Sequence, residues 1–163
     1  MTRALPCLFA LFLFVQPAAA ETIIGQIVAI QDGDTLTILD QSKHQTKIRL
    51  AEIDAPEKGQ PYGTRAKQEL SALAFAKLAT VDAQDIDRYG RTVGRITVEG
   101  MDVNAELVKR GAAWVYRKYS KDPTLLILEQ RAREARTGLW AMPEPVPPWE
   151  WRKSRSDTRS GQK

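Results

Sequence analysis

The sequence predicts an α+β fold, a five-stranded Greek-key β-barrel with about three α-helices packed around it. Two observations carry this prediction. Three short strand-like segments follow one another between residues 23 and 53, and two more follow a single helical segment. Five strands with one helix after the third is the element order of a small barrel of the oligonucleotide-binding (OB) type.

The first three strands are predicted from residue type and alternation. Residues 23–30 are rich in Ile and Val, residues 35–39 alternate Thr with Leu and Ile, and residues 46–53 follow a polar turn. The short connections favour a meander. Prolines and glycines in residues 56–63 then predict a loop.

A helix and two further strands complete the predicted barrel. Apolar residues recur at helical spacing up to Leu78, which predicts an amphipathic helix over residues 64–79. Strand patterns return at residues 81–86 and 92–98, joined by a turn over residues 87–91.

Two more helices are predicted after the barrel. Residues 103–110 form a short helix that ends at Gly111, and residues 125–136 form a last helix that ends at Gly138. Glycine at these positions predicts a left-handed residue that stops each helix.

The chain divides into three parts, residues 1–20, 21–141 and 142–163. In the first part, Arg3 precedes an apolar run that ends in three alanines, which predicts a secretory signal peptide cut before Glu21. The alternative is a retained membrane anchor, but the run is shorter than the roughly 20 residues of a spanning helix. We therefore expect export to the periplasm or the medium, without stable membrane association after cleavage.

Cysteine content and charge bear on how the fold is stabilised and on which partners the sequence predicts. Cys7 is the only cysteine, so the mature chain has no disulfide to stabilise it. The net charge is +4, yet residues 21–148 contain 18 basic and 18 acidic side chains, so bulk charge argues little for a polyanion partner. No sign of an oligomer interface is present, and a monomer is the default expectation.

The third part has a different composition. Four prolines between residues 142 and 148 favour extended backbone, and Trp149 and Trp151 are expected to cover apolar surface. Beyond Arg152 the residues are basic, small and polar, which predicts disorder.

Two carboxylates are the first candidates for chemistry. Asp34 opens the second predicted strand and Asp54 closes the third, so a meander can bring both to one end of the sheet. Adjacent carboxylates repel unless a cation lies between them, and oxygen ligands suit Ca²⁺ or Mg²⁺. A plain hairpin turn at residues 32–34 is the alternative interpretation.

Two arginines and a third carboxylate extend the candidate site. Arg49 and Arg91 could point at the same end of the sheet, where guanidinium groups bind phosphate oxygens. The alternatives are a solvated strand residue for Arg49 and an ion pair with Asp87 for Arg91. Glu57, just beyond Pro56, could act as a general base toward water.

Four short motifs resemble one known family. They are Asp-Gly-Asp-Thr at 32–35, Ile-Arg-Leu at 48–50, Ile-Asp-Ala-Pro-Glu at 53–57 and Asp-Arg-Tyr-Gly-Arg at 87–91. In this order they resemble the staphylococcal nuclease (thermonuclease) family, over about residues 23–140. The family resemblance implies a Ca²⁺-dependent phosphodiesterase on an OB barrel that cleaves DNA and RNA at the 5′ P–O bond and leaves 3′-phosphates.

The resemblance also implies roles for individual residues. Asp34, Asp54 and the backbone carbonyl of Ala55 would ligate Ca²⁺, with Mg²⁺ or Mn²⁺ as other possible ions. Glu57 would activate the attacking water. Arg49 and Arg91 would clamp the scissile phosphate.

This chain departs from the family's best-known member at several positions. Ala55 replaces a threonine, the lysine-rich loop after the glutamate becomes residues 58–63, and Trp114 and Tyr116 replace two tyrosines. We interpret Trp114 and Tyr116 as a base-stacking face, with core packing as the alternative.

Arg88 and Tyr89, in the same turn as Arg91, are further substrate-binding candidates. The leading hypothesis is an exported metal-dependent nuclease. The alternative is a non-catalytic OB module that binds nucleic acid or an envelope protein, because a fold does not by itself decide function.

Overall fold

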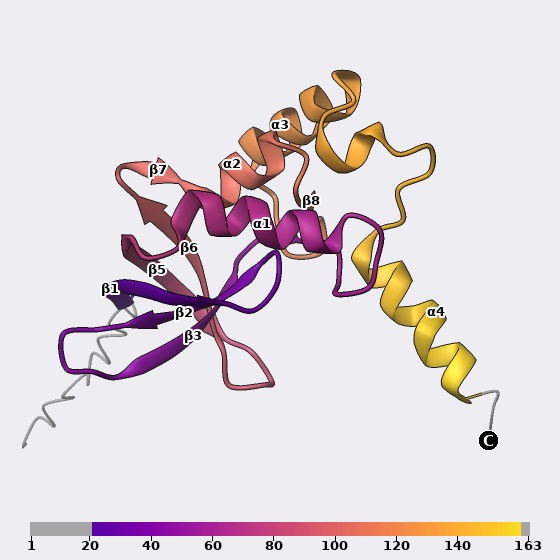
Figure 1. The fold of residues 1–163 in the computed structure, drawn as a ribbon. Helices are drawn as coiled ribbons and strands as arrows, with labels where there is room; N and C mark the ends of the chain where they lie inside the picture. The colour runs from indigo at the N-terminus through magenta and orange to yellow at the C-terminus, as the bar shows by residue number, and fades with distance from the viewer. Residues whose placement is uncertain (1–20, 161–163) are drawn as a thin grey trace, which may run out of the picture.

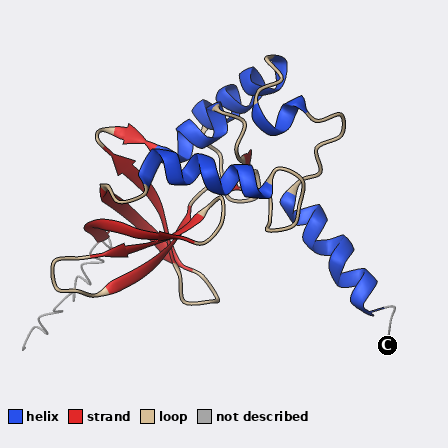
Figure 2. Ribbon diagram, viewed as in Figure 1, coloured by secondary structure: helices blue, strands red, loops and turns tan. Residues whose placement is uncertain are grey.

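The computed structural model describes residues 21–160, and a closed five-stranded barrel forms its centre (Figures 1 and 2). The barrel strands are β1 (Glu21–Ile30), β2 (Thr35–Leu39), β3 (Gln45–Leu50), β5 (Leu78–Ile86) and β6 (Thr92–Val98). They pair in the order β3-β2-β1-β5-β6, and a parallel pairing of β3 with β6 closes the barrel. The predicted fold class is confirmed.

Fully buried aliphatic side chains fill the barrel, among them Ile27, Leu36, Ile48 and Ile96. These side chains come from four of the five strands, so their burial holds the barrel together. The register places Arg49 opposite Thr35 in the β2–β3 pair. Arg49 therefore lies at the end of the barrel where β2 begins.

The third predicted strand is interrupted. β3 ends at Leu50, a turn follows, and the chain resumes as β4 (Ile53–Asp54), which pairs with β8 (Trp114–Val115) in a separate two-stranded sheet. Glu52 adopts a left-handed conformation with φ 64°, which no residue of a continuous strand adopts. The prediction of one strand over residues 46–53 is therefore wrong. The turn directs Asp54 away from the line of β3.

The helices pack on one side of the barrel, as Figure 1 shows. They are α1 (Gly63–Ala74), α2 (Val103–Lys109), α3 (Pro123–Glu134) and the 3₁₀ helix η1 (Gly138–Ala141), with the short strand β7 (Met101–Asp102) before α2. Gly111, with φ 63°, follows α2 and is confirmed as its left-handed stop. The prediction that Gly138 stops the last helix is wrong, because α3 ends at Glu134, the left-handed residue after it is Arg136 with φ 51°, and Gly138 begins η1.

The first helix is shorter than the sequence predicts. α1 ends at Ala74, and the backbone N–H of Ala76 donates to the carbonyl of Ile27 in β1. Leu78 then begins β5 opposite Gln26 and is exposed, so it does not belong to the helix's apolar face. Pairing with β1 overrides the local helical pattern.

The C-terminal segment differs most from the prediction. Residues 142–147 lie outside any helix or strand, which agrees with the predicted extended backbone. The residues beyond Arg152, predicted to be disordered, instead belong to a helix, α4 (Pro148–Ser160). Pro148 begins it, at a position where the missing N–H is not needed by the helix. Trp149 stacks on Tyr116 with a centroid distance of 5.2 Å and an interplanar angle of 5°, so the expected contact of this indole is confirmed.

The predicted signal peptide, residues 1–20, lies outside the described residues. Within residues 21–160, no helix is long and apolar enough to cross a membrane.

Candidate active site

An open cleft at one end of the barrel gathers almost all of the predicted site residues. Its walls come from the turn before β2, the β3–β4 region, the loop after β4, the β5–β6 hairpin, the end of β8 and α4. The lining includes Asp32, Asp34, Arg49, Asp54, Ala55, Glu57, Arg88, Tyr89, Arg91, Tyr116 and Arg152. Trp114 is the predicted residue that does not line the cleft.

Asp34 and Asp54 converge on one guanidinium nitrogen. Arg49 Nη2 lies 3.2 Å from Asp34 Oδ2 and 2.9 Å from Asp54 Oδ1. Arg49 Nη1 also donates to two backbone carbonyls of the β3–β4 turn, at 2.7 Å and 3.0 Å. The Arg49 side chain is only 14% exposed, so it is not the solvated strand residue of the alternative interpretation.

The two aspartates of the first motif have different partners. Asp34 Oδ2 accepts a hydrogen bond from the backbone N–H of Ala55 at 2.7 Å, which ties β2 to the loop after β4. Asp32 Oδ1 accepts from the backbone N–H of Asp34 at 3.1 Å, as in a turn. Burial, with the charge of Asp34, raises the pKa of Asp32 to about 6.

Asp54 is the most enclosed carboxylate of the cleft. It is 1% exposed and lies opposite Trp114 in the β4–β8 pair. Burial raises the pKa of Asp54, and hydrogen bonds from Arg152 act in the opposite direction. A carboxylate in this position needs a positive partner to stay ionised, and the structure gives it two guanidinium groups.

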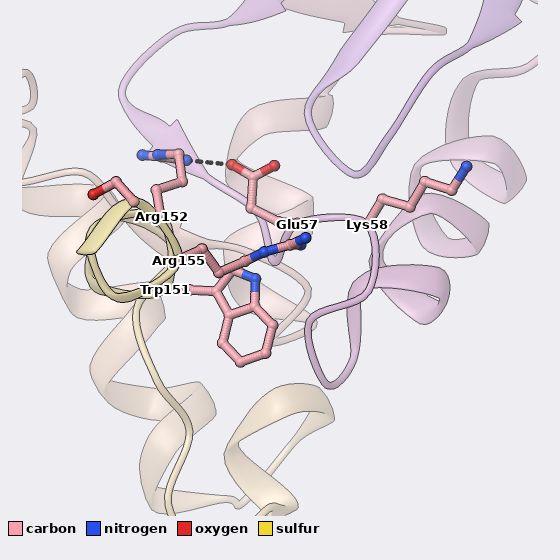
Figure 3. A pocket seen from close by; sticks show the side chains of 6 residues that line it. Glu57, Lys58, Trp151, Arg152 and Arg155 are labelled. Carbon is pink, nitrogen blue, oxygen red and sulfur yellow. Dashed lines mark hydrogen bonds and ion pairs between the residues drawn. The ribbon is translucent and has the colours of Figure 1, made fainter. Parts of the chain in front are cut away.

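Glu57 lies at the rim of the cleft with its carboxylate partly exposed. Its backbone N–H donates to Gln60 Oε1 at 2.9 Å, and its Oε1 accepts from Arg152 Nη1 at 2.5 Å (Figure 3). The carboxylate is therefore within the same cluster as Asp54 while remaining open to water. This is a position from which a general base could act.

The β5–β6 hairpin brings Arg91 to the opposite wall. Its guanidinium pairs with Asp87 at 2.7 Å, and Nη1 also reaches Thr35 Oγ1 at 3.4 Å. Burial works against ionisation of Asp87, but the hydrogen bonds from Arg91 dominate and lower its pKa. The Asp87 ion pair foreseen as the alternative is present, and Arg91 nevertheless lines the cleft.

Arg88 and Tyr89 form the tip of this hairpin. Arg88 Nη2 donates to the Tyr89 hydroxyl at 2.7 Å, and the guanidinium groups of Arg88 and Arg91 both lie over the Tyr89 ring. The ring is mostly exposed. A substrate-binding role for this tip remains a prediction.

The two aromatic candidates on and after β8 have different environments. Trp114 is buried, with Trp140 and Trp149 against it edge-on and the guanidinium of Arg133 4.8 Å from its ring centroid. This is the placement that the core-packing alternative predicts. Tyr116 lines the cleft but stacks on Trp149, so base stacking there remains a prediction.

Arg152 was not foreseen as a site residue. Its Nη2 lies 2.7 Å from Asp54 Oδ2, and its Nη1 bonds both Asp54 Oδ1 and Glu57 Oε1. The adjacent tryptophans could have signalled that this segment docks, but the prolines before it pointed to extended chain. Gln60 was also missed, although it is buried beside Glu57.

The cleft offers the oxygen ligands that a hard divalent cation prefers. Carboxylate oxygens of Asp34 and Asp54 converge, and no histidine or cysteine lines the cleft. Among residues 21–160, no group of three or more Asp, Glu, His or Cys side chains could hold an ion by itself. Backbone carbonyl or water oxygens would therefore have to complete the coordination shell of a cation. The backbone carbonyl of Ala55 is the predicted ligand of this kind.

Comparison with known proteins identifies the family of this chain. Residues 47–142 match the family described as staphylococcal nuclease homologue. An uncharacterised endonuclease of Escherichia coli O157:H7 is 44% identical over 143 residues, covering 87% of this chain and 93% of that protein. The chain belongs to the staphylococcal nuclease family.

Other relatives of this family member extend the comparison. A micrococcal nuclease of Shigella flexneri is 38% identical over 156 residues, which covers 89% of each chain. Protein ParB of Escherichia coli is 42% identical over 170 residues, covering 98% of this chain and 94% of that protein.

The segment that matches the staphylococcal nuclease family contains most of the site residues but not all of them. Arg49, Asp54, Glu57 and Arg91 lie within the matched residues 47–142. Arg152 lies beyond them, on α4. Asp34 lies before them, next to the start of β2. The site therefore combines residues of the matched segment with Asp34 from before it and Arg152 from the C-terminal helix.

Proposed function

We propose that this protein is a Ca²⁺-dependent nuclease that hydrolyses phosphodiester bonds of DNA and RNA. The observation that carries the proposal is the convergence of Asp34 and Asp54 on Arg49, with Glu57 in the same cleft. The nuclease and endonuclease names of its relatives support the same activity.

The residues of the cleft suit the successive parts of such a reaction. Glu57 takes the proton of the attacking water, whose oxygen bonds to phosphorus as the bond to the 5′-oxygen breaks. The 5′-oxygen leaves and takes a proton from solvent water in the open cleft, so the products are a 3′-phosphate and a 5′-hydroxyl. A bound Ca²⁺ would supply positive charge beside the phosphoryl oxygens.

The arginines contribute by position and charge. Arg49 holds the carboxylates of Asp34 and Asp54 close together, and Arg91 presents its guanidinium from the facing β5–β6 hairpin. Guanidinium groups near the scissile phosphate stabilise the charge that accumulates during attack. Residues 1–20 support export, so the proposed site of action is the periplasm or the medium.

The test is a cleavage assay with defined ions and defined product ends. Purified protein is incubated with plasmid DNA and with RNA in Ca²⁺, Mg²⁺, Mn²⁺ or EDTA. We expect cleavage in Ca²⁺, none in EDTA, and 5′-hydroxyl ends that a polynucleotide kinase labels without prior phosphatase treatment. Absence of cleavage in all three ions would overturn the proposal and favour a non-catalytic binding module.

A further inference from the structure

α4 places a third guanidinium group directly on the carboxylates of the cleft. Arg152 forms two hydrogen bonds with Asp54 and one with Glu57, at 2.7, 3.2 and 2.5 Å. The Arg152 side chain is 43% exposed, against 14% for Arg49. Of these two arginines, Arg152 is therefore the one with room to move.

Arg152 occupies oxygens that the proposed reaction needs. Both oxygens of Asp54 accept hydrogen bonds from Arg152, and so does Oε1 of Glu57. A cation ligated by Asp54, or a water bound to Glu57, would compete with this guanidinium for the same lone pairs. A cation ligated by Asp54 would therefore displace some of the hydrogen bonds that Arg152 makes to the two carboxylates.

The start of α4 is fixed independently of Arg152. Trp149 stacks on Tyr116, and Gln60 Nε2 donates to the carbonyl of Val146 at 2.7 Å. These contacts keep the helix beside the cleft if the guanidinium leaves Asp54 and Glu57. Arginine has a long side chain, so it can reach a new partner in the cleft without movement of the helix.

The surface next to Arg152 is suited to a polyanion. A cavity of about 300 Å³ lies between the Glu57 loop and α4, and its basic lining residues are Lys58, Arg152 and Arg155. Figure 3 shows Arg155 beside Glu57 and the Lys58 side chain directed away from both arginines. Glu57 is the only carboxylate that lines it. Basic side chains grouped in this way bind phosphates of nucleic acid without reading sequence.

We propose that Arg152 is a substrate-binding residue that exchanges the carboxylates of Asp54 and Glu57 for a phosphate of the bound nucleic acid. The inference rests on the proposed nuclease function. Asp54 would hold the divalent cation, whose charge would repel the guanidinium of Arg152 and neutralise its partner, which would favour the exchange. A phosphate offers the same bidentate geometry that a carboxylate does.

The experiment compares Arg152→Ala and Arg152→Lys with a matched control, Lys153→Ala. Lys153 is the next residue on α4, is exposed and does not line either cavity, so its variant removes one charge without touching the cleft. Two quantities are measured. The first is kcat and KM for a single-stranded oligonucleotide, and the second is Ca²⁺ affinity by calorimetry without substrate.

We expect Arg152→Ala to raise KM about tenfold or more, because a charge-assisted hydrogen bond to the substrate is lost. The same variant should bind Ca²⁺ several-fold more tightly, because its competitor is gone. Arg152→Lys should lie between Arg152→Ala and the wild type in both KM and Ca²⁺ affinity. Lys153→Ala should change neither KM nor Ca²⁺ affinity by more than about twofold.

Three outcomes would overturn the inference. Unchanged KM and unchanged Ca²⁺ affinity would show that Arg152 only packs against the cleft. Tighter Ca²⁺ binding with unchanged KM would show competition without a substrate contact. A higher kcat/KM in Arg152→Ala would show that Arg152 only obstructs the site.

Failure of the nuclease proposal can be separated from failure of this one. If the wild-type protein cleaves nothing in any ion, fluorescence anisotropy with a labelled oligonucleotide in Ca²⁺ still tests Arg152. Weaker binding by Arg152→Ala than by Lys153→Ala supports the inference in that case, and equal binding overturns it.

Discussion

The side-chain amide of Gln60 donates a hydrogen bond to the backbone carbonyl of Val146 at 2.7 Å, across 86 positions of sequence. The same amide accepts a hydrogen bond from the backbone N–H of Glu57 through its Oε1. One buried side chain therefore joins the loop that carries Glu57 to the segment that enters α4. The position of Glu57 depends on that link.

We predict that Gln60→Ala lowers both stability and activity. The backbone N–H of Glu57 and the carbonyl of Val146 lose their partner, which should cost about 1–3 kcal/mol of unfolding free energy. kcat should fall because Glu57 is held less firmly. Urea unfolding and initial rates measure the two effects. The exposed Gln45→Ala serves as control, and equal behaviour of the two variants would contradict the prediction.

Glu57→Gln tests the proposed general base. The amide keeps the size of the side chain but cannot take a proton from water, so the rate should fall by about two to four orders of magnitude. Ca²⁺ should still raise the thermal unfolding midpoint of the variant, because Asp34 and Asp54 are unchanged. The exposed Glu144→Gln is the control. Turnover close to that of the wild type would remove Glu57 from its assigned role.

Glu129 on α3 supports the β4–β8 strand pair that carries Asp54. It is 1% exposed on α3, and its carboxylate accepts from the backbone N–H of Val115 at 2.9 Å and from Arg117 at 2.6 Å. Val115 lies opposite Ile53 in the β4–β8 pair, next to Asp54. The buried carboxylate thus fixes the strand on which Asp54 depends.

We therefore predict that Glu129→Ala destabilises the protein by about 1–3 kcal/mol, because the buried N–H of Val115 loses its acceptor, whereas Arg117 is exposed and can be solvated. Glu129→Gln should cost less, since the amide oxygen can still accept from Val115. Chemical denaturation compares both variants with the exposed Glu134→Ala on the same helix. Similar stability of the Glu129→Ala and Glu134→Ala variants would refute the supporting role.

Local patterns were sufficient for most of the barrel. Residues 35–39 and 92–98 were predicted as strands at the bounds that the structure has, because their alternation agrees with their tertiary pairing. The motif residues Asp34, Asp54, Glu57 and Arg91 could be placed at one end because each lies at or near a strand terminus.

Elements set by distant contacts could not be predicted in this way. The turn after Leu50 depends on the hydrogen bond from Ala51 to the carbonyl of Gly94, and no local residue signals it. α4 follows a proline-rich stretch, and its place depends on Trp149 finding Tyr116. Arg152 could not be assigned to the site without that docking.

The last prediction concerns pH and the cluster around Arg95. This guanidinium pairs with Glu52, Asp102 and Asp122, at 2.9, 2.8 and 2.7 Å. Its hydrogen bond is the largest cause of the lowered pKa of Asp122, which also caps α3 by accepting from Thr124. Because the folded-state pKa lies below the ordinary value of 3.8, the stabilisation is complete above that value and is lost as pH falls through the folded-state pKa.

Asp122→Asn isolates the charge, since asparagine also caps helices well. At neutral pH the variant should be about 1 kcal/mol less stable than the wild type. The difference should shrink as pH falls from 3.8 toward the folded-state pKa of Asp122, because the wild type loses the contribution of a charge that the variant lacks. Urea unfolding at a series of pH values, from about 7 to about 2.5, gives the comparison. A difference that stays constant with pH would assign the role of Asp122 to the helix cap rather than to its charge.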